Sequence, residues 1–112
     1  MHATILPVLA DPVRLTLISA LKEGERSVGD LTRAAGIAQS GVSRHLRILH
    51  QAGVVSVRAQ AQQRLYRLNP EPFLQLEGWL AEFHHLWSAR LERFAGALTQ
   101  RQLERRNDPG EQ

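Results

Sequence analysis

The sequence predicts a mainly α-helical fold with one small β-hairpin. The chain has 112 residues, of which 43% are hydrophobic, and this size supports one core rather than several domains. Apolar residues recur at helical spacing before residue 53 and after residue 72, whereas between these positions they alternate with polar residues, as in a strand. We expect residues 1–106 to form the folded domain and residues 107–112 to form a disordered tail.

Start and stop signals predict the first two helices. Asp11 is an N-cap followed by a proline at the first helical position, and Gly24 ends the apolar run that follows. Ser27 and Asp30 stand at the spacing of a capping box, so we expect a short second helix that ends at Gly36.

A third helix is expected over the range Gln39 to Ala52, with Gly53 at the left-handed position that ends many helices. Helical spacing turns Val42, Leu46 and Leu49 toward the interior. Two helices joined by a short turn containing a glycine form a helix-turn-helix.

A β-hairpin should follow this third helix. Val55 and Val57 alternate with polar residues, and a second apolar run begins at Leu65 after the polar stretch Ala59 to Gln63. The tip, Gln60-Ala61-Gln62, lacks the glycine that such turns favour. A hairpin beside a helix-turn-helix is a wing, so the fold expected is a winged helix-turn-helix.

A long C-terminal helix is expected to open at Pro72 and to run through about Gln100. Its apolar residues follow one another at steps of three and four, which makes a stripe that so small a domain cannot cover. We expect this dimerisation helix to form a homodimer, although the stripe could instead belong to the core of its own subunit. The residues expected at the dimer interface are Leu76, Trp79, Leu80, Phe83, Trp87, Leu91 and Phe94.

Basic residues are concentrated in a stretch that has no acidic residue. Thirteen of the 14 basic residues are arginine, and no aspartate or glutamate lies between Asp30 and Glu71. Arginine suits phosphates and guanine edges, so this stretch points to double-stranded DNA, although a solvated face without acids is the alternative. The six arginines in this stretch are Arg33, Arg44, Arg47, Arg58, Arg64 and Arg67.

The third helix carries polar side chains opposite its apolar face. A recognition helix meets base edges with the residues near its N-terminus, where glutamine can bind adenine and arginine can bind guanine. We therefore expect Gln39, Ser40, Ser43 and Arg44 to read bases, and Arg47, one turn further on, to contact a phosphate.

Four segments, in this order and at these separations, resemble the ArsR (ArsR/SmtB) family of bacterial transcriptional repressors. They are Leu9-Ala10-Asp11-Pro12-Val13-Arg14-Leu15, Val28-Gly29-Asp30-Leu31, Ser43-Arg44-His45-Leu46 and Ala52-Gly53-Val54-Val55. The pattern from Trp79 to Phe83, followed by Trp87, is similar to a cysteine-free branch of that family that does not sense metals.

The resemblance implies a winged helix-turn-helix that dimerises through its terminal helices. It places Gln39, Ser40, Ser43 and Arg44 at the base-reading positions, and it places the wing residues Arg58 and Arg64 at the minor groove or the DNA backbone. We expect Gln62, at the tip of the wing, to contact the DNA backbone as well. The chain departs from the family pattern at Ala38, where many members have a serine N-cap, and at Ala61, which replaces the usual wing glycine. Gly41 adds an intrinsic helix penalty near the first turn of the third helix, which could let that turn adjust on binding.

No enzyme, metal or cofactor site is indicated. The chain has no cysteine and lacks the glycine loop, HExxH and nucleophile-elbow motifs. His84 and His85 are adjacent on a helix and point about 100° apart, so they do not readily share one metal ion. The alternative is a pH response through these histidines. We expect His45 and His50 to lie at the surface or to face phosphate.

These observations predict a cytoplasmic, sequence-specific DNA-binding regulator. We expect a homodimeric repressor that occludes a promoter at a palindromic operator, with no membrane partner, and nothing in the sequence names an inducer. The alternative is a winged-helix protein-interaction module that does not bind DNA.

Overall fold

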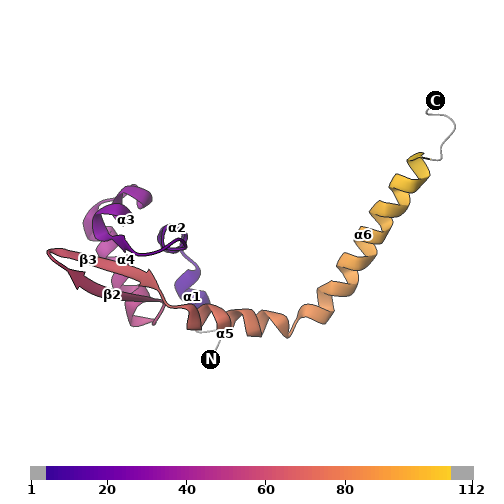
Figure 1. Cartoon of the computed structure of the whole chain (residues 1–112). Coiled ribbons are helices and arrows are strands. Elements are labelled where there is room, and N and C mark those ends of the chain that lie inside the picture. The colour runs from indigo at the N-terminus through magenta and orange to yellow at the C-terminus, as the bar shows by residue number, and fades with distance from the viewer. Residues whose placement is uncertain (1–4, 107–112) are drawn as a thin grey trace. The chain divides into compact units, whose positions relative to one another are not determined.

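The computed structural model describes residues 5–106, in which four helices with one short strand precede a β-hairpin and two further helices follow it (Figure 1). The chain divides into two units, residues 1–79 and residues 80–112. The predicted tail, residues 107–112, lies outside the described residues. The elements in order are α1 (Leu6–Leu9), α2 (Pro12–Ala20), β1 (Arg26–Ser27), α3 (Val28–Ala35), α4 (Gln39–Gln51), β2 (Val55–Gln60), β3 (Gln63–Leu68), α5 (Pro70–Ala81) and α6 (His84–Arg106).

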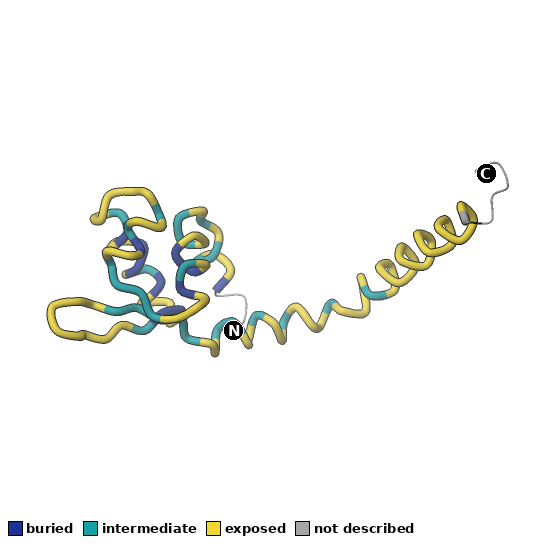
Figure 2. The backbone as a smooth tube through the Cα atoms, turned by 45° about the horizontal axis from the view of Figure 1, so that its top comes forward, coloured by how far each residue is buried: buried dark blue, intermediate teal, exposed yellow. Residues whose placement is uncertain are grey.

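The core of the first unit forms where α2, α3 and α4 meet the start of β2. Figure 2 shows these buried segments in dark blue. The predicted inward positions Val42, Leu46 and Leu49 are confirmed, because each side chain is fully buried. The fully buried side chains are Leu17, Leu31, Val42, Leu46, Leu49, Val54 and Val55.

Side-chain caps start α2 and α3 as predicted. The Asp11 carboxylate accepts hydrogen bonds from the backbone N–H groups of Val13, at 2.8 Å, and Arg14, at 3.1 Å. At α3 the capping box is complete, because Ser27 Oγ accepts from the Asp30 N–H and the Asp30 carboxylate accepts from the Ser27 N–H. These bonds occupy backbone donors that a helix start leaves unpaired.

The predicted hairpin is present and belongs to a sheet of three strands in the order β1-β3-β2. β2 and β3 pair in antiparallel register up to Gln60 and Gln63, so the loop contains only Ala61 and Gln62 and is shorter than the polar stretch suggests. β1 was not predicted from the sequence. It contributes two residues, which pair with Tyr66 and Leu65 of β3.

The predicted long C-terminal helix is confirmed as α6, which has 23 residues, but the expectation that it runs unbroken from Pro72 to about Gln100 is wrong. The segment instead forms α5, which begins at Pro70, and α6, which begins at His84. Between them the backbone hydrogen bonds span three residues instead of the four of an α-helix. The N–H of Phe83 donates to Leu80 O, and the N–H of Leu86 donates to Phe83 O. No helix in the described part of the chain is both long enough and apolar enough to span a membrane.

The Asp11 cap predicts a pH dependence of folding stability. Its hydrogen bond from the Arg14 N–H lowers the pKa of Asp11, so the unfolded chain binds more protons than the folded chain between the two pKa values. The stabilisation is therefore complete above the unfolded pKa, about 4, and is lost as pH falls through the lower folded pKa. Asp11→Asn keeps a capping oxygen but does not titrate.

We expect wild type to melt at a higher temperature than Asp11→Asn at pH 7 and the difference to shrink as pH falls below about 4. Circular dichroism melts from pH 7 to pH 3 measure this difference. A difference that stays constant over that range contradicts the role given to the ionised cap.

Candidate nucleic-acid interface

The outward face of α4 carries every predicted base-reading residue. Helical period places the buried positions on one side, and Gln39, Ser40, Ser43, Arg44 and Arg47 are all exposed on the other. No side chain caps the start of α4, since Ala38 occupies the N-cap. The N–H of Gly41 donates to Ala38 O at 3.0 Å. The N–H groups of Gln39 and Ser40 have no acceptor within residues 5–106 and are open to an external acceptor such as a phosphate.

Gly41 has a packing role that the sequence did not reveal. A Cβ atom added at this position would lie 3.1 Å from Cδ1 of Ile37, in the turn between α3 and α4. Contacts this short require the neighbouring side chain to shift. The glycine therefore lets the turn lie close against the first turn of α4.

The expectation that His45 lies at the surface or faces phosphate is wrong. Its side chain is 9% exposed, and its Nδ1 is 3.2 Å from NH1 of Arg14 in α2. The same arginine donates from Nε to the carbonyl oxygen of Val8 at 2.6 Å. A buried imidazole needs a hydrogen-bond partner, and this one ties α4 to α2. His50, by contrast, is exposed.

A groove of about 390 Å³ separates α4 from one face of the wing. Gln39, Ser43 and Arg47 line it from α4, and the strand side chains opposite come from β2 and β3. Alternation along the strands places these wing residues on the same face of the sheet. The lining residues are Val28, Gln39, Ser43, Arg47, His50, Val57, Arg64 and Tyr66.

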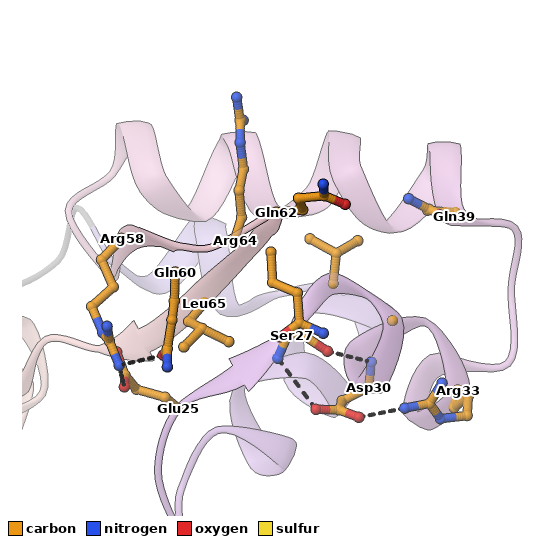
Figure 3. A pocket seen from close by; sticks show the side chains of 13 residues that line it. Glu25, Ser27, Asp30, Arg33, Gln39, Arg58, Gln60, Gln62, Arg64 and Leu65 are labelled. Atoms are coloured by element: carbon orange, nitrogen blue, oxygen red, sulfur yellow. Dashed lines mark hydrogen bonds and ion pairs between the residues drawn. The ribbon is translucent and has the colours of Figure 1, made fainter.

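A larger hollow of about 730 Å³ lies between the wing and the start of α3 (Figure 3). Here Arg58 binds Glu25 with two hydrogen bonds, Nε to Oε2 at 2.7 Å and NH2 to Oε1 at 2.8 Å. The bonds from Arg58 lower the pKa of Glu25, and the carboxylate raises the pKa of Arg58. Figure 3 shows Arg64 extending away from this ion pair.

Ion pairing divides the six arginines of the acid-free stretch into two groups. Arg33 binds Asp30 and Arg58 binds Glu25, so both positive charges are compensated within the chain. The other four form no hydrogen bond or ion pair within residues 5–106. They are Arg44 and Arg47 on α4 and Arg64 and Arg67 on β3 of the wing.

The predicted dimer-interface residues differ in exposure. In the first unit, Leu76 packs partly against the core and Trp79 is also half-buried. In the second unit the Phe83 and Trp87 rings stack with centroids 6.3 Å apart. Leu80, Trp87, Leu91 and Phe94 are exposed, the last two by 61% and 63%. An apolar surface this open on a helix is typical of an interface.

The histidines and carboxylates of the described part do not gather into a metal site. No group of three or more histidine, cysteine, aspartate or glutamate side chains in residues 5–106 has the geometry to hold an ion. His84 and His85 lie exposed at the start of α6.

A helix-turn-helix with an exposed polar and cationic second helix, flanked by a β-hairpin, defines the class of winged helix-turn-helix DNA-binding regulators. Comparison with known proteins narrows this class. The sequence pattern of the bacterial regulatory protein arsR family matches residues 11–57. The transcriptional repressor SdpR of Bacillus subtilis is 30% identical over 79 residues, which are 70% of this chain and 88% of that repressor. The chain therefore belongs to the ArsR family of bacterial regulatory proteins.

Two further matches agree with this assignment. The biofilm growth-associated repressor of Xylella fastidiosa is 42% identical over 74 residues, which are 66% of this chain and 65% of that repressor. A homodimeric winged helix-turn-helix DNA-binding domain from Mycobacterium bovis, solved in solution, has a TM-score of 0.60 and 27% identity. That match covers 77% of this chain and 82% of the other. The matched family and relatives are regulators, not enzymes.

The wing tip predicts a stabilising substitution. Ala61 has a φ of 55°, in the left-handed region that glycine adopts without strain. Ala61→Gly should stabilise the folded chain by up to about 1 kcal/mol, because relief of this strain exceeds the added entropy of the unfolded chain. Urea denaturation measures the change. A destabilised Ala61→Gly variant contradicts the strained turn, and Ala59→Gly, within β2, is the control expected to destabilise.

Proposed function

We propose that this chain is a homodimeric transcriptional repressor that binds a palindromic operator in double-stranded DNA. The observation that carries the proposal is the outward face of α4. It combines exposed glutamine, serine and arginine side chains with an uncapped helix start, beside a groove that it shares with the wing. Membership of a family of regulatory proteins supports the same function.

Base reading is assigned to the first two turns of α4. Gln39 can bind adenine through N6 and N7, and Arg44 can bind guanine through O6 and N7. Ser40 and Ser43 can donate or accept, so they suit either kind of base. All four side chains are exposed, as insertion into a major groove requires.

Contacts with the DNA backbone are assigned to α4 and the wing. Arg47 lies one turn beyond the base-reading residues and lines the groove with Arg64 of β3. Neither arginine has a carboxylate partner within residues 5–106, so both charges are available to phosphates. Gln62, exposed at the wing tip, can add a neutral hydrogen bond.

Dimerisation is assigned to the apolar residues of α5 and α6. Leu80, Trp87, Leu91 and Phe94 expose apolar area that a second copy of the chain would cover. The domain from Mycobacterium bovis is homodimeric, which supports this arrangement. A dimer would present two α4 helices to successive major grooves, with half-sites about 10 bp apart. By covering such a site, this cytoplasmic protein would block access to a promoter and so repress transcription.

The roles given to two arginines on α4 can be separated by mutation. Arg44→Ala should weaken binding to the operator by about 1 to 3 kcal/mol and should relax base preference at one position. The operator used is the duplex that the wild-type chain enriches from random DNA. Arg47→Ala should weaken binding to all duplexes alike and lower the salt slope by about 1. Fluorescence anisotropy with cognate and scrambled duplexes, at several salt concentrations, measures both effects.

Since both arginines are exposed, neither substitution should change the melting temperature, which is the control for folding. Equal losses on cognate and scrambled DNA from both variants would falsify the division of roles. A wild-type chain with no affinity for any duplex would instead favour a protein-interaction module.

The dimer interface can be tested on α6. Leu91→Asp places a charge within the apolar stripe, so it should convert the dimer to a monomer and reduce operator affinity. Ala89→Asp introduces the same charge on the opposite side of the helix and should leave the dimer intact. Sedimentation velocity measures the oligomeric state. A dimeric Leu91→Asp variant, or a monomer that binds the operator as tightly as wild type, contradicts the proposed interface.

A further inference from the structure

The ion pair between Glu25 and Arg58 links the residue before β1 to β2, and these two strands are not neighbours in the sheet. Glu25 directly precedes β1, Arg58 lies in β2, and β3 separates these strands in the sheet. The guanidinium must therefore reach over the central strand to meet the carboxylate, with N–O distances of 2.7 and 2.8 Å. NH2 of Arg58 also donates to Oε1 of Gln60 at 3.0 Å.

Strand register places Arg58 and Arg64 on opposite faces of the wing. Arg58 pairs with Leu65, whereas Arg64 pairs with Ala59, one position further along. Paired residues share a face and successive residues alternate, so the two arginines point to different sides. Arg64 shares its face with Tyr66 and Val57, and all three line the groove beside α4. The Arg64 side chain also borders the hollow that contains the ion pair, but it extends away from that pair (Figure 3). Arg58 faces the loop that leads into α3.

The base of the wing is fixed by the core, since Val55 of β2 is buried and Tyr66 and Leu68 of β3 pack against the core cluster. The wing's link to the helix-turn-helix through the sheet is β1, which contributes only Arg26 and Ser27 to the pairing with β3. A two-stranded hairpin is marginally stable alone, so its orientation depends on such attachments. A bidentate ion pair has a defined geometry and can hold the wing at one angle.

The same pair makes Arg58 a poor phosphate ligand. The hydrogen bonds from Arg58 hold the pKa of Glu25 below its ordinary range, so the carboxylate is ionised at neutral pH. Glu25 occupies Nε and NH2 of Arg58, so a DNA phosphate could bind only NH1 unless it displaced the carboxylate. In either case the nearby carboxylate would repel the phosphate. Arg64 faces no such competition within the described residues.

We propose that Arg58 is a positioning residue, whose ion pair with Glu25 orients the wing so that Arg64 and Gln62 reach the DNA, and that it does not itself bind phosphate. This inference rests on the proposed function, and it replaces the expectation that Arg58 contacts DNA. Glu25, which had no predicted role, becomes the second member of the pair.

The test compares single and exchanged charges in the full-length chain. Glu25→Gln and Arg58→Gln should each weaken operator binding several-fold, and the double variant Glu25→Arg with Arg58→Glu should restore most of the affinity. Glu23→Gln is the matched control, because Glu23 is exposed in the same loop and forms no ion pair within residues 5–106. This control measures the effect on DNA binding of removing one negative charge from the loop before β1.

A phosphate contact by Arg58 predicts the opposite sign for Glu25. Glu25→Gln would then free the arginine and bind at least as tightly as Glu23→Gln, and the exchanged pair would place a carboxylate at the DNA and bind no better than Arg58→Gln. Either result overturns the positioning role. Arg64→Gln, as a reference for a true backbone contact, should lower the salt slope by about 1.

Hydrogen exchange without DNA separates this inference from the proposed function. If the ion pair holds the wing, the amides of β2 and β3 should exchange faster in both single variants and return to the wild-type rate in the exchanged pair. Unchanged exchange in the single variants overturns the positioning role even if DNA binding is normal. A wild-type chain that binds no duplex refutes the proposed function, while the exchange rates still decide whether the pair holds the wing.

Discussion

The packing of one side of α4 into the core determines which residues this chain can offer to DNA. Val42, Leu46 and Leu49 are fully buried among side chains of α2 and α3, and His45 is held beside them by Arg14. A helix fixed on one side has only one orientation. The outward face follows from this constraint, because its residues occupy the remaining positions of the helical period. The proposed DNA contacts are therefore a consequence of the hydrophobic core.

Ion pairs determine which of the exposed arginines are available to DNA. The acid-free stretch suggests six available arginines, yet Asp30 and Glu25, which lie just outside it, compensate two of them. The other four arginines of the stretch, which form no ion pair within residues 5–106, lie on α4 and along β3. Positive charge is thus concentrated where a phosphate backbone would run past α4 and the wing, and the compensated arginines serve the geometry of the domain. Counting charges in the sequence does not make this distinction, whereas distances do.

Local signals in the sequence predicted most of the first unit. The Asp11 cap, the capping box at Ser27 and the apolar face of α4 are short-range patterns, and the structure has all of them. The features that the sequence did not predict are those that leave no local signal in it. Strand β1 is too short to show a period, and the break after Ala81 contains neither glycine nor proline. The burial of His45 and the pairing of Glu25 depend on partners 31 and 33 residues away, which no local pattern reveals.

The candidate site was predicted to a similar extent. Every base-reading position expected on α4 is exposed on one face, while the roles assigned to the wing depend on register and on ion pairs.

Selection of bound sequences from random duplex DNA tests the central claim that two copies of α4 read one operator together. The account predicts an enriched motif of two inverted half-sites whose centres lie about 10 bp apart or at a multiple of that spacing. A single unrepeated half-site, or no enrichment over unselected DNA, would contradict it.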